Sequence, residues 1–421
     1  RDVERSRGLG DVYKRQASYG GAECGCALHA IDSGLDCASQ AVVSVQNAAA
    51  ETTAFTPFFD YYAVLLSNPY GGAGQATNYT HEMIFGATGD LDKILGWSGA
   101  KITVSGAYNA GGNLSDTIGN FFTMSESFVT DGVMFYQFFL EQKIDFGGDW
   151  ANFKIGRISM GGQFDTIPVF GSLTSGAFDS NPASVFSNSP FTSSPIATWG
   201  AIASYNTADN LSFSAGLFQI PQNVQSPKWS GTDWGISSDD GYMAVFQTTW
   251  SPTLFDDGNG GLNGTYQAGV WFFGGFDMPC LDGSGESRGN GYGFYLQGQQ
   301  QIWVDENNAD KYVALFGGAQ VAPITSIAAM PLMVYGGFQL QGFVPCRKND
   351  GFYAAVACGW FSSELDKVQE ATYETAIEIT YVIQINQHIS IQPDFQYIMR
   401  PYGNTEIDDA LVVGGQLLVT F

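Results

Sequence analysis

The segment 410–421 constrains the fold most, because apolar residues occupy alternate positions up to the last residue of the chain. One phase of this period-2 pattern is entirely apolar: Leu411, Val413, Leu417, Val419 and Phe421. Gln416 and Thr420 occupy the opposite phase. A strand with an apolar face, a polar face and a terminal aromatic residue is typical of the closing strand of a bacterial outer-membrane β-barrel. The pattern predicts lipid around the molecule and a polar lumen inside it.

The composition agrees with many strands. Glycine (53 residues), phenylalanine (32) and tyrosine (20) are abundant among the 421 residues, and turn-forming clusters recur along the chain. The mean hydropathy is near zero, and no run of about 20 apolar residues occurs. A helical membrane protein is therefore excluded. A barrel is not, because its lipid-facing and lumen-facing residues alternate and cancel in any average.

The net charge of −24 argues against nucleic-acid binding. Residues 1–16 differ from the rest, with five of the 17 basic residues and three of the 41 acidic ones. This segment lacks the apolar stretch of a signal peptide, so we interpret it as adapter or vector sequence and expect the native signal peptide to be missing. Segment 17–50 is expected to be a short periplasmic extension, with a helix near 41–50 at the barrel mouth. The barrel itself is expected over 51–421.

Alternating segments between turn signals predict an all-β fold, a transmembrane antiparallel up-and-down barrel of about sixteen strands. The expected strands are 54–67, 78–92, 100–108, 132–144, 152–160, 198–206, 211–219, 242–250, 265–276, 291–304, 311–321, 330–341, 352–361, 371–385, 388–399 and 411–421. An even number places both ends of the barrel in the periplasm. Connections after even strands should then be short, and connections after odd strands should be long and extracellular. Two even connections, 251–264 and 342–351, are longer than expected.

Segment 371–385 shows the alternation most clearly. Tyr373 and the isoleucines that follow it fall on one face, and Glu374 and Glu378 fall on the other. Because a charged residue facing lipid is costly, Glu378 is predicted to face the lumen. Segment 388–399 repeats the pattern, which places Asp394, Gln396 and the following Arg400 on the lumen side.

Segment 152–160 changes phase in the middle. Phe153 and Ile155 share one face, whereas Ile158 and Met160 fall on the other. A β-bulge at Gly156 would reconcile the two halves and would turn the next residue, Arg157, into the lumen. Arg157 is therefore predicted to line the channel.

From about residue 52 to 421 the chain resembles the carbohydrate-selective porins of the OprB type. The motifs that carry the resemblance, in chain order, are Asn68-Pro-Tyr-Gly-Gly72, Asp90-Leu-Asp-Lys-Ile-Leu-Gly-Trp-Ser-Gly99, Phe139-Leu-Glu-Gln142, Phe153-Lys-Ile-Gly-Arg157, Tyr205, Gly216-Leu-Phe218, Ile377-Glu-Ile-Thr-Tyr381 and Ile391-Gln-Pro-Asp-Phe-Gln-Tyr397. Arg400-Pro-Tyr-Gly403 and the cysteine-bearing N-terminal extension depart from the family pattern. The resemblance implies a sixteen-stranded barrel in the bacterial outer membrane that admits sugars such as glucose by passive diffusion, as a single barrel rather than a trimer.

Inward positions suggest a path for sugars. Glutamine amides donate and accept hydrogen bonds, which suits sugar hydroxyl groups, and aromatic faces suit the apolar side of a pyranose ring. The predicted lumen residues are Gln137, Glu141, Lys143, Arg157, Tyr295, Gln297, Gln299, Gln301, Trp303, Glu374, Glu378, Asp394, Gln396 and Arg400. The simpler interpretation is that these groups only hydrate a water-filled channel.

The connection 161–197 is the longest in the barrel and is rich in phenylalanine, serine and proline. Connections of this length are usually functional or disordered. Because Phe164, Phe170 and Phe178 are unusual in a solvated linker, we expect the loop to fold inward and narrow the pore. A lid over the extracellular rim is the alternative.

Sites for catalysis, cofactors or metals are not expected. The chain has three histidines and no CxxC pair, so zinc is disfavoured, and His388 with Ser390 lacks an orienting partner. The turn 256–261 is more simply an ordinary turn than a calcium site. The topology separates Cys280 from Cys346, which could instead pair with Cys24, Cys26 or Cys37; free thiols are equally plausible.

Competing functions remain open on the sequence. The expected partners are small sugars, outer-membrane lipid and lipopolysaccharide. A general porin that favours cations because of the acidic composition is the main alternative. An outer-membrane hydrolase or a soluble secreted β-sandwich or adhesin are other classes, but a sandwich would need a second sheet to cover the isoleucine face of 371–385.

Overall fold

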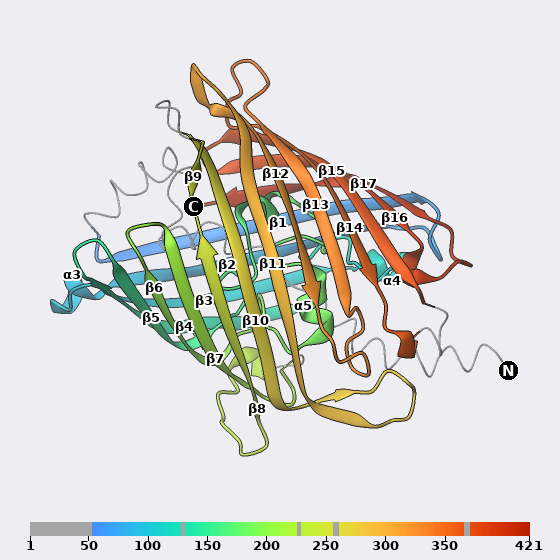
Figure 1. Ribbon diagram of the computed structural model, residues 1–421, viewed down its shortest axis with the longest axis horizontal. Helices are drawn as coiled ribbons and strands as arrows, with labels where there is room; N and C mark the ends of the chain where they lie inside the picture. The colour runs from blue at the N-terminus through green and yellow to red at the C-terminus, as the bar shows by residue number, and fades with distance from the viewer. Residues whose placement is uncertain (1–52, 128–130, 225–228, 256–260, 366–370) are drawn as a thin grey trace.

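The computed structural model describes residues 53–127, 131–224, 229–255, 261–365 and 371–421. Their strands form one closed antiparallel sheet, in which each long strand pairs with its neighbour in sequence and β1 pairs with β17 (Figure 1). No helix in these ranges is long and apolar enough to cross a membrane. The segments 1–16, 17–50 and 256–260, and therefore the proposed helix near 41–50, the N-terminal cysteines and most of the turn 256–261, lie outside the described residues.

All sixteen expected strands are present, within a few residues of their predicted limits. They are β1 (Phe55–Tyr70), β2 (Thr77–Asp90), β3 (Ala100–Gly111), β4 (Gly132–Asp145), β5 (Trp150–Ile158), β6 (Thr198–Asn206), β7 (Leu211–Ile220), β8 (Gly241–Trp250), β10 (Leu262–Pro279), β11 (Ser287–Asp305), β12 (Asn308–Val321), β13 (Leu332–Gln341), β14 (Gly351–Trp360), β15 (Tyr373–Asn386), β16 (Ile389–Met399) and β17 (Ala410–Thr420). The additional β9 (Thr253–Leu254) pairs with the start of β10, which explains one of the two long even connections.

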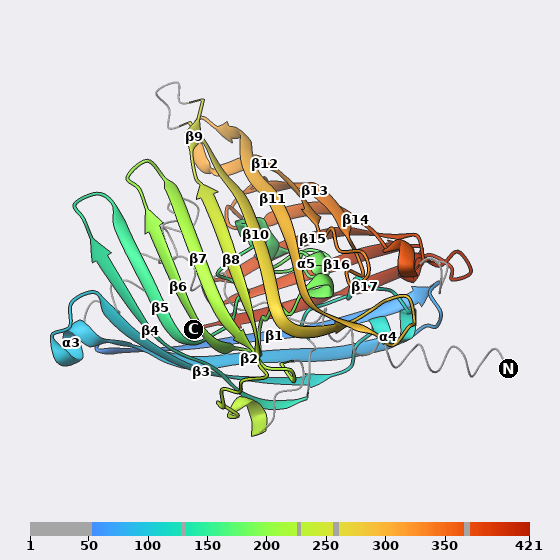
Figure 2. The ribbon, with the colours of Figure 1, turned by 60° about the horizontal axis from the view of Figure 1, so that its bottom comes forward.

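In the described ranges, the short helices lie in the connections between strands. They are α3 (Leu91–Leu95), α4 (Ser115–Ile118), η2 (Pro168–Ser172), α5 (Ala183–Asn188), η3 (Trp229–Gly231) and η4 (Pro401–Gly403). Asp90 caps the N-terminus of α3, since its carboxylate accepts hydrogen bonds from the amides of Asp92 and Lys93. The loop before β4 carries α4, and the loop between β5 and β6 carries η2 and α5 (Figure 2).

The chain end closes the barrel as predicted. Thr420 lies opposite Asp60 of β1 and donates a hydrogen bond of 2.5 Å to its carboxylate. The amide of Phe421 donates to the carbonyl of Phe59 at 2.9 Å. In β17, Val413 is exposed and Gln416 is buried, so the apolar phase faces outward and the polar phase inward. In lipid this closure is required, because an unpaired sheet edge would leave backbone groups without partners.

The two faces of β15 also agree with the prediction. Glu374 and Glu378 are completely buried inside the barrel, whereas Ile379 and Ile385 on the opposite phase are exposed on the outside. Outward side chains of this kind form an apolar belt around the wall.

The predicted bulge at Gly156 is wrong. β5 pairs with both neighbours without a register shift, and Arg157 lies opposite Phe138 and Trp199 on the outward phase. Ile158 points inward and is apolar because it packs against the loop 161–197 inside the barrel. The apparent phase change therefore arises because the loop 161–197 covers this part of the inner wall, and not because of a β-bulge.

Arg157 is tolerated on the outer phase because a neighbouring loop covers it. It lies next to the extracellular end of β5, where an outward charge costs about 0–1 kcal/mol rather than the larger midplane cost. Its guanidinium donates to the carbonyl of Ala197 at 2.5 Å and is attracted by Asp233 of the loop 221–240. Trp234 of the same loop stacks on Phe138 with a ring separation of 6.2 Å. The Arg157 side chain is thus only 6% exposed.

The seam between β1 and β17 gives a test of this architecture. A Cβ added at Gly414 would lie 2.0 Å from the carbonyl oxygen of Leu65. Gly414→Val should therefore strain the seam and reduce stability by about 1–3 kcal/mol, measured as a lower temperature for loss of the compact band in semi-native electrophoresis. Val413→Ile, on the exposed lipid side of the same strand, is the matched control and should change little. If both variants lost the compact band at the same temperature, the result would contradict the described pairing of β1 with β17.

Candidate functional site

Loop L3, residues 159–197, enters the barrel instead of covering its rim. Every side chain from Leu173 to Ala197 is buried, and α5 lies within the ring of strands in both views (Figure 1, Figure 2). The exposed part of the loop is confined to residues near Gly162–Ser172, where Pro168 is the most open. Its inward position matches the expectation, whereas its effect on the size of permeating solutes stays a prediction.

The three phenylalanines assigned to the constriction anchor the loop. Phe164 meets Phe218 edge-to-face at 6.2 Å, and Phe170 packs between Phe316 at 6.5 Å and Tyr335 at 5.8 Å. Phe164, Phe170 and Phe178 are completely buried. They hold L3 against the wall by apolar packing, so the polar, half-exposed strip near Gln163 and Ser172 is the part that faces the open lumen.

A second loop also folds into the barrel, which the sequence reasoning missed. Loop L2, here residues 112–127, places Phe122 and Met124 in the same apolar cluster as Phe170. The amides of L2 and L3 need hydrogen-bond acceptors inside the barrel, because buried backbone N–H groups are costly when unpaired. The inward carboxylates of β15 supply them.

Glu374 anchors L2, and Glu378 anchors L3. Glu374 accepts hydrogen bonds from the amides of Phe121 and Phe122, both at 2.7 Å. Glu378 accepts from the amides of Thr174 at 2.7 Å and Ser175 at 3.1 Å. Both glutamates face inward as predicted, but the loops cover them, so neither carboxylate is presented to a solute.

The neighbouring strand β16 holds the same two loops. The Nε2 of Gln396 donates to the carbonyl of Met124 in L2 at 2.9 Å. Gln392 donates to the carbonyl of Ser172 and to the hydroxyl of Thr174, both at 3.0 Å. Asp394 and Gln396 are therefore buried wall residues that face inward, like Glu378.

The predicted row on β11 forms a polar network with its neighbours. Tyr295 donates to Gln247 of β8 at 2.7 Å, and Gln297 donates to Gln267 of β10 at 2.8 Å. The resulting glutamine belt crosses five strands and consists of Gln247, Gln267, Gln297, Gln299, Gln320 and Gln339. The sequence could have located its other members, because each lies on the inward phase of an expected strand.

Gln299 is the member of the belt that touches L3. Its Oε1 accepts from the amide of Val169 at 3.1 Å, and its Nε2 donates to Gln339 at 2.9 Å. Gln301 lies opposite Ala314, which is buried inside the barrel. Gln299 and Gln301 are only partly buried, unlike Tyr295 and Gln297.

Trp303 does not belong to this row. The register of β11 shifts between Gln301 and Trp303, which moves Trp303 opposite Val313 on the outward phase. Its ring lies 5.8 Å from Phe343, and the Nζ of Lys311 lies 5.5 Å from its centre. The prediction that Trp303 faces the lumen is wrong because one inserted residue reverses the alternation beyond it.

The prediction that Arg400 faces the lumen is also wrong. β16 ends at Met399, and Arg400 adopts φ 54°, which interrupts the alternation. Its guanidinium lies 4.4 Å above the ring of Tyr373, a residue of the outward phase of β15. The side chain therefore lies at the rim of the barrel, away from the lumen residues.

The inward face of β4 and β5 carries charge of both signs. Glu141 accepts from Asn152 at 2.6 Å and lies 3.7 Å from the Nζ of Lys154, which the sequence reasoning missed. Lys154 also donates to Gln163 of L3 at 3.1 Å. Lys143 is exposed toward the periplasmic end, with its Nζ 4.5 Å above the Trp150 ring.

Two further side chains connect L3 to the wall. Gln137, a predicted lumen residue, accepts at 3.2 Å from the amide of Ser159, where L3 begins. Within L3, Asp165 accepts from Gln320 of β12 at 2.6 Å. Burial raises the pKa of Asp165 well above its usual value, which favours the neutral carboxyl.

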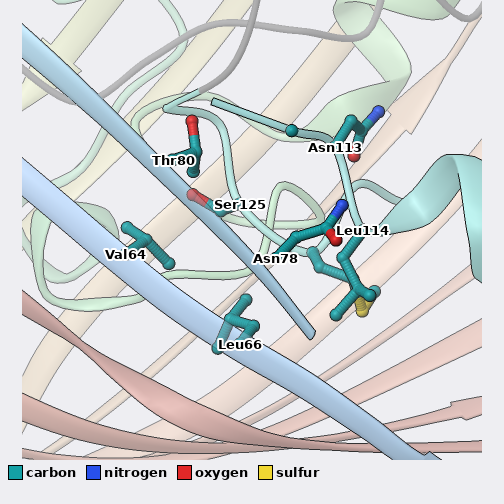
Figure 3. Close-up of a pocket in the computed structure, with 9 residues that line it drawn as sticks. Val64, Leu66, Asn78, Thr80, Asn113, Leu114 and Ser125 are labelled. Atoms are coloured by element: carbon teal, nitrogen blue, oxygen red, sulfur yellow. The ribbon is translucent and has the colours of Figure 1, made fainter. Parts of the chain in front are cut away.

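A small crevice between L2 and the wall is too small for a sugar. Figure 3 shows the wall residues Val64 and Leu66 of β1 beside their partners Thr80 and Asn78 of β2, with Asn113, Leu114 and Ser125 of L2 completing the lining. Its volume of about 10 Å³ corresponds to about one water molecule. The wall near Gln299, Gln301 and the exposed strip of L3 is the better candidate for contact with a solute.

Comparisons with known proteins agree with this architecture. A family model described as "Carbohydrate-selective porin, OprB family" matches residues 74–421. Porin B of Pseudomonas aeruginosa is 23% identical over 381 residues, which cover 82% of this chain and 82% of that protein.

Solved structures show the same fold. The high-pH structure of Pseudomonas putida OprB matches with a TM-score of 0.78 and 22% identity, over 90% of this chain and 97% of that chain. The low-pH structure of Pseudomonas putida OprB matches with a TM-score of 0.57 and 16% identity, over 91% of this chain and 97% of that chain.

The packing of L3 can be tested at Phe170. Phe170→Ala removes a buried ring between β12 and β13, which should cost about 3–5 kcal/mol of local packing energy and loosen the loop. Single-channel conductance in planar bilayers should rise and fluctuate more. Phe338→Ala on the exposed outer phase of β13 is the control. An unchanged conductance for Phe170→Ala would contradict the view that this ring keeps L3 inside the pore.

Proposed function

The chain belongs to the OprB family of carbohydrate-selective porins and lies in the bacterial outer membrane, and we propose that it passes glucose-type monosaccharides and similar small sugars by passive diffusion. In this proposal, L3 narrows the lumen, and the half-buried amides of Gln299 and Gln301 contact the sugar. Diffusion down a gradient requires no cofactor and no energy coupling.

The observation that carries the proposal is the arrangement of glutamine side-chain amides on β11, next to the exposed part of L3. Gln299 and Gln301 are partly open, whereas Tyr295 and Gln297 behind them are 4% and 3% exposed. Gln299 is bonded to Val169 and Gln339, and Gln301 accepts the amide of Asn263, so each amide keeps further donor and acceptor positions for a solute. Each outer amide can donate and accept, as a sugar hydroxyl also can. Because the inner residues fix the wall, the outer amides can offer hydrogen bonds without a large ordering cost.

Such contacts suit transport because they are individually weak. A net hydrogen bond contributes about 0.5–1.5 kcal/mol, and conduction requires that a bound solute can also leave. On a different part of the inner wall, Lys154 of β5 and Glu141 of β4 are partly exposed and lie 3.7 Å apart. Their opposite charges give that part of the wall no strong preference for an anion or a cation, which favours neutral solutes.

The proposed partners are small sugars within the lumen, and lipid and lipopolysaccharide around it. We propose that the protein acts as a single barrel. The outward side chains of β15 and β16, such as Ile379, Ile391 and Phe395, are exposed and apolar, as a lipid-facing wall requires.

A general porin that favours cations is the second candidate. The net charge of −24 supports it, because an acidic protein attracts cations toward its openings. The two candidates differ in whether glucose passes faster than a non-sugar solute of equal size. They also differ in the reversal potential measured across a salt gradient.

Liposome swelling with glucose and an equal-sized non-sugar solute tests the proposal. The wild-type protein should admit glucose faster, and Gln299→Ala with Gln301→Ala should reduce this preference roughly two- to tenfold, since each change removes one possible hydrogen bond. Gln300→Ala is the matched control, because Gln300 lies between them and is bonded to Tyr266 on the outward phase. Equal swelling rates for the two solutes would support the general porin instead.

A further inference from the structure

Two acidic side chains meet behind L3 on the inner wall. Glu378 of β15 lies opposite Gln396 of β16, and Asp394 of β16 lies opposite Thr380. The carboxyl groups of Glu378 and Asp394 are in hydrogen-bonding contact. Their side chains are 0% and 5% exposed, so water does not separate them.

The hydrogen bonds around this pair leave one position that needs a donor. Glu378 accepts two amides of L3, and Asp394 accepts the Nε2 of Gln396 at 2.7 Å through its Oδ2. The buried Oδ1 of Asp394 has no donor in ordinary hydrogen-bond geometry, and the backbone amide of Phe395 interacts with this carboxyl. Because ionised carboxylates only accept hydrogen bonds, contact between two of them requires a hydrogen on one.

The surroundings supply no compensating positive charge. The nearby acids are Glu374 on β15, Glu126 on L2 and Asp179 on L3, and Tyr353 of β14 lies opposite Thr380. Within the described part of the chain, neither carboxyl forms an ion pair with a basic side chain. Two buried negative charges in contact would repel each other strongly.

We propose that Glu378 and Asp394 bind one proton between them and that this proton is part of the anchor of L3. When the proton is present, one carboxyl donates to the other and the wall stays closed around the amides of Thr174 and Ser175. When base removes it, the O–H bond breaks, the proton goes to water and both groups become negative. Their repulsion is relieved only if water enters between L3 and the wall, which loosens the loop.

Glu374 provides an internal comparison. Its carboxylate accepts three backbone amides, from Phe121, Phe122 and Tyr402. These three amide donors favour the charged form of Glu374, whereas its burial opposes that form. Glu374 lies opposite Gly359 of β14 rather than beside a second acid, so deprotonation there creates no pair of negative charges. The conductance step expected for L3 should therefore not depend on Glu374.

Conductance of the full chain in planar bilayers, recorded from about pH 4 to about pH 9, tests the proposal. The wild-type protein should show a step to higher conductance as the pH rises. In Asp394→Asn the amide N–H can donate to Glu378 at every pH, so this variant should keep the low-pH conductance throughout. Glu374→Gln, the matched control, should keep the step. A step that persists in Asp394→Asn, or that disappears in Glu374→Gln, would overturn the proposal.

Infrared spectroscopy of the folded protein detects the proton independently of transport. The carbonyl stretch of a protonated carboxyl should be present near neutral pH and should weaken in Asp394→Asn and Glu378→Gln, with folding verified by the compact band in semi-native electrophoresis. Burial also raises the pKa of Asp165, so this carboxyl can absorb in the same region, and the change on substitution is the measured quantity. No change in either variant would refute the shared proton. The conductance measurement rests on the proposed porin function, whereas the infrared measurement does not. If the protein proved not to select glucose, the infrared test of the shared proton would still stand.

Discussion

The structure depends on one requirement, that backbone N–H and C=O groups away from water must find partners. The wall meets it by closing β1 on β17, so that no edge remains. Inside the barrel the requirement returns, because L2 and L3 bring irregular backbone into a buried space. There the partners are side chains of the wall, chiefly Glu374, Glu378 and Gln396. Many polar side chains of the inner face thus form hydrogen bonds with L2 and L3, and only those that remain uncovered can contact a solute.

The fold was predictable from the sequence because lipid imposes a strict alternation on every strand. The isoleucines of β15 and the apolar phase of β17 could face only outward, and the strand number followed from counting such segments. The errors arose where alternation is locally broken. One extra residue before Trp303 reversed its phase, and a positive φ at Arg400 ended the pattern. Neither leaves a clear signal in the residue types.

The site was less predictable, for a different physical reason. A period-2 pattern predicts whether a side chain lies on the lipid face or the lumen face of the barrel wall. It does not predict which loops cover the lumen face. Ile158 is apolar and inward because L3 lies over it, and the same covering makes Glu378 an anchor instead of a pore-lining charge. The inward folding of L2 could not be inferred from its composition. Gln297 and Gln299 of β11 lie on the inner wall, as the alternation predicted, and bond to inward glutamines of neighbouring strands. Their contact with a solute stays a prediction.

The location of the anchors also sets an order on assembly. The amide of Phe121 is separated from Glu374 by 253 positions, and that of Thr174 from Glu378 by 204. Long-range contacts of this kind form slowly, because a large chain entropy must be lost first. Most of the barrel strands must therefore be paired before L2 and L3 can bind to the inner wall. A newly inserted molecule would pass through an intermediate with a wider lumen, and the loops would narrow that lumen late in assembly.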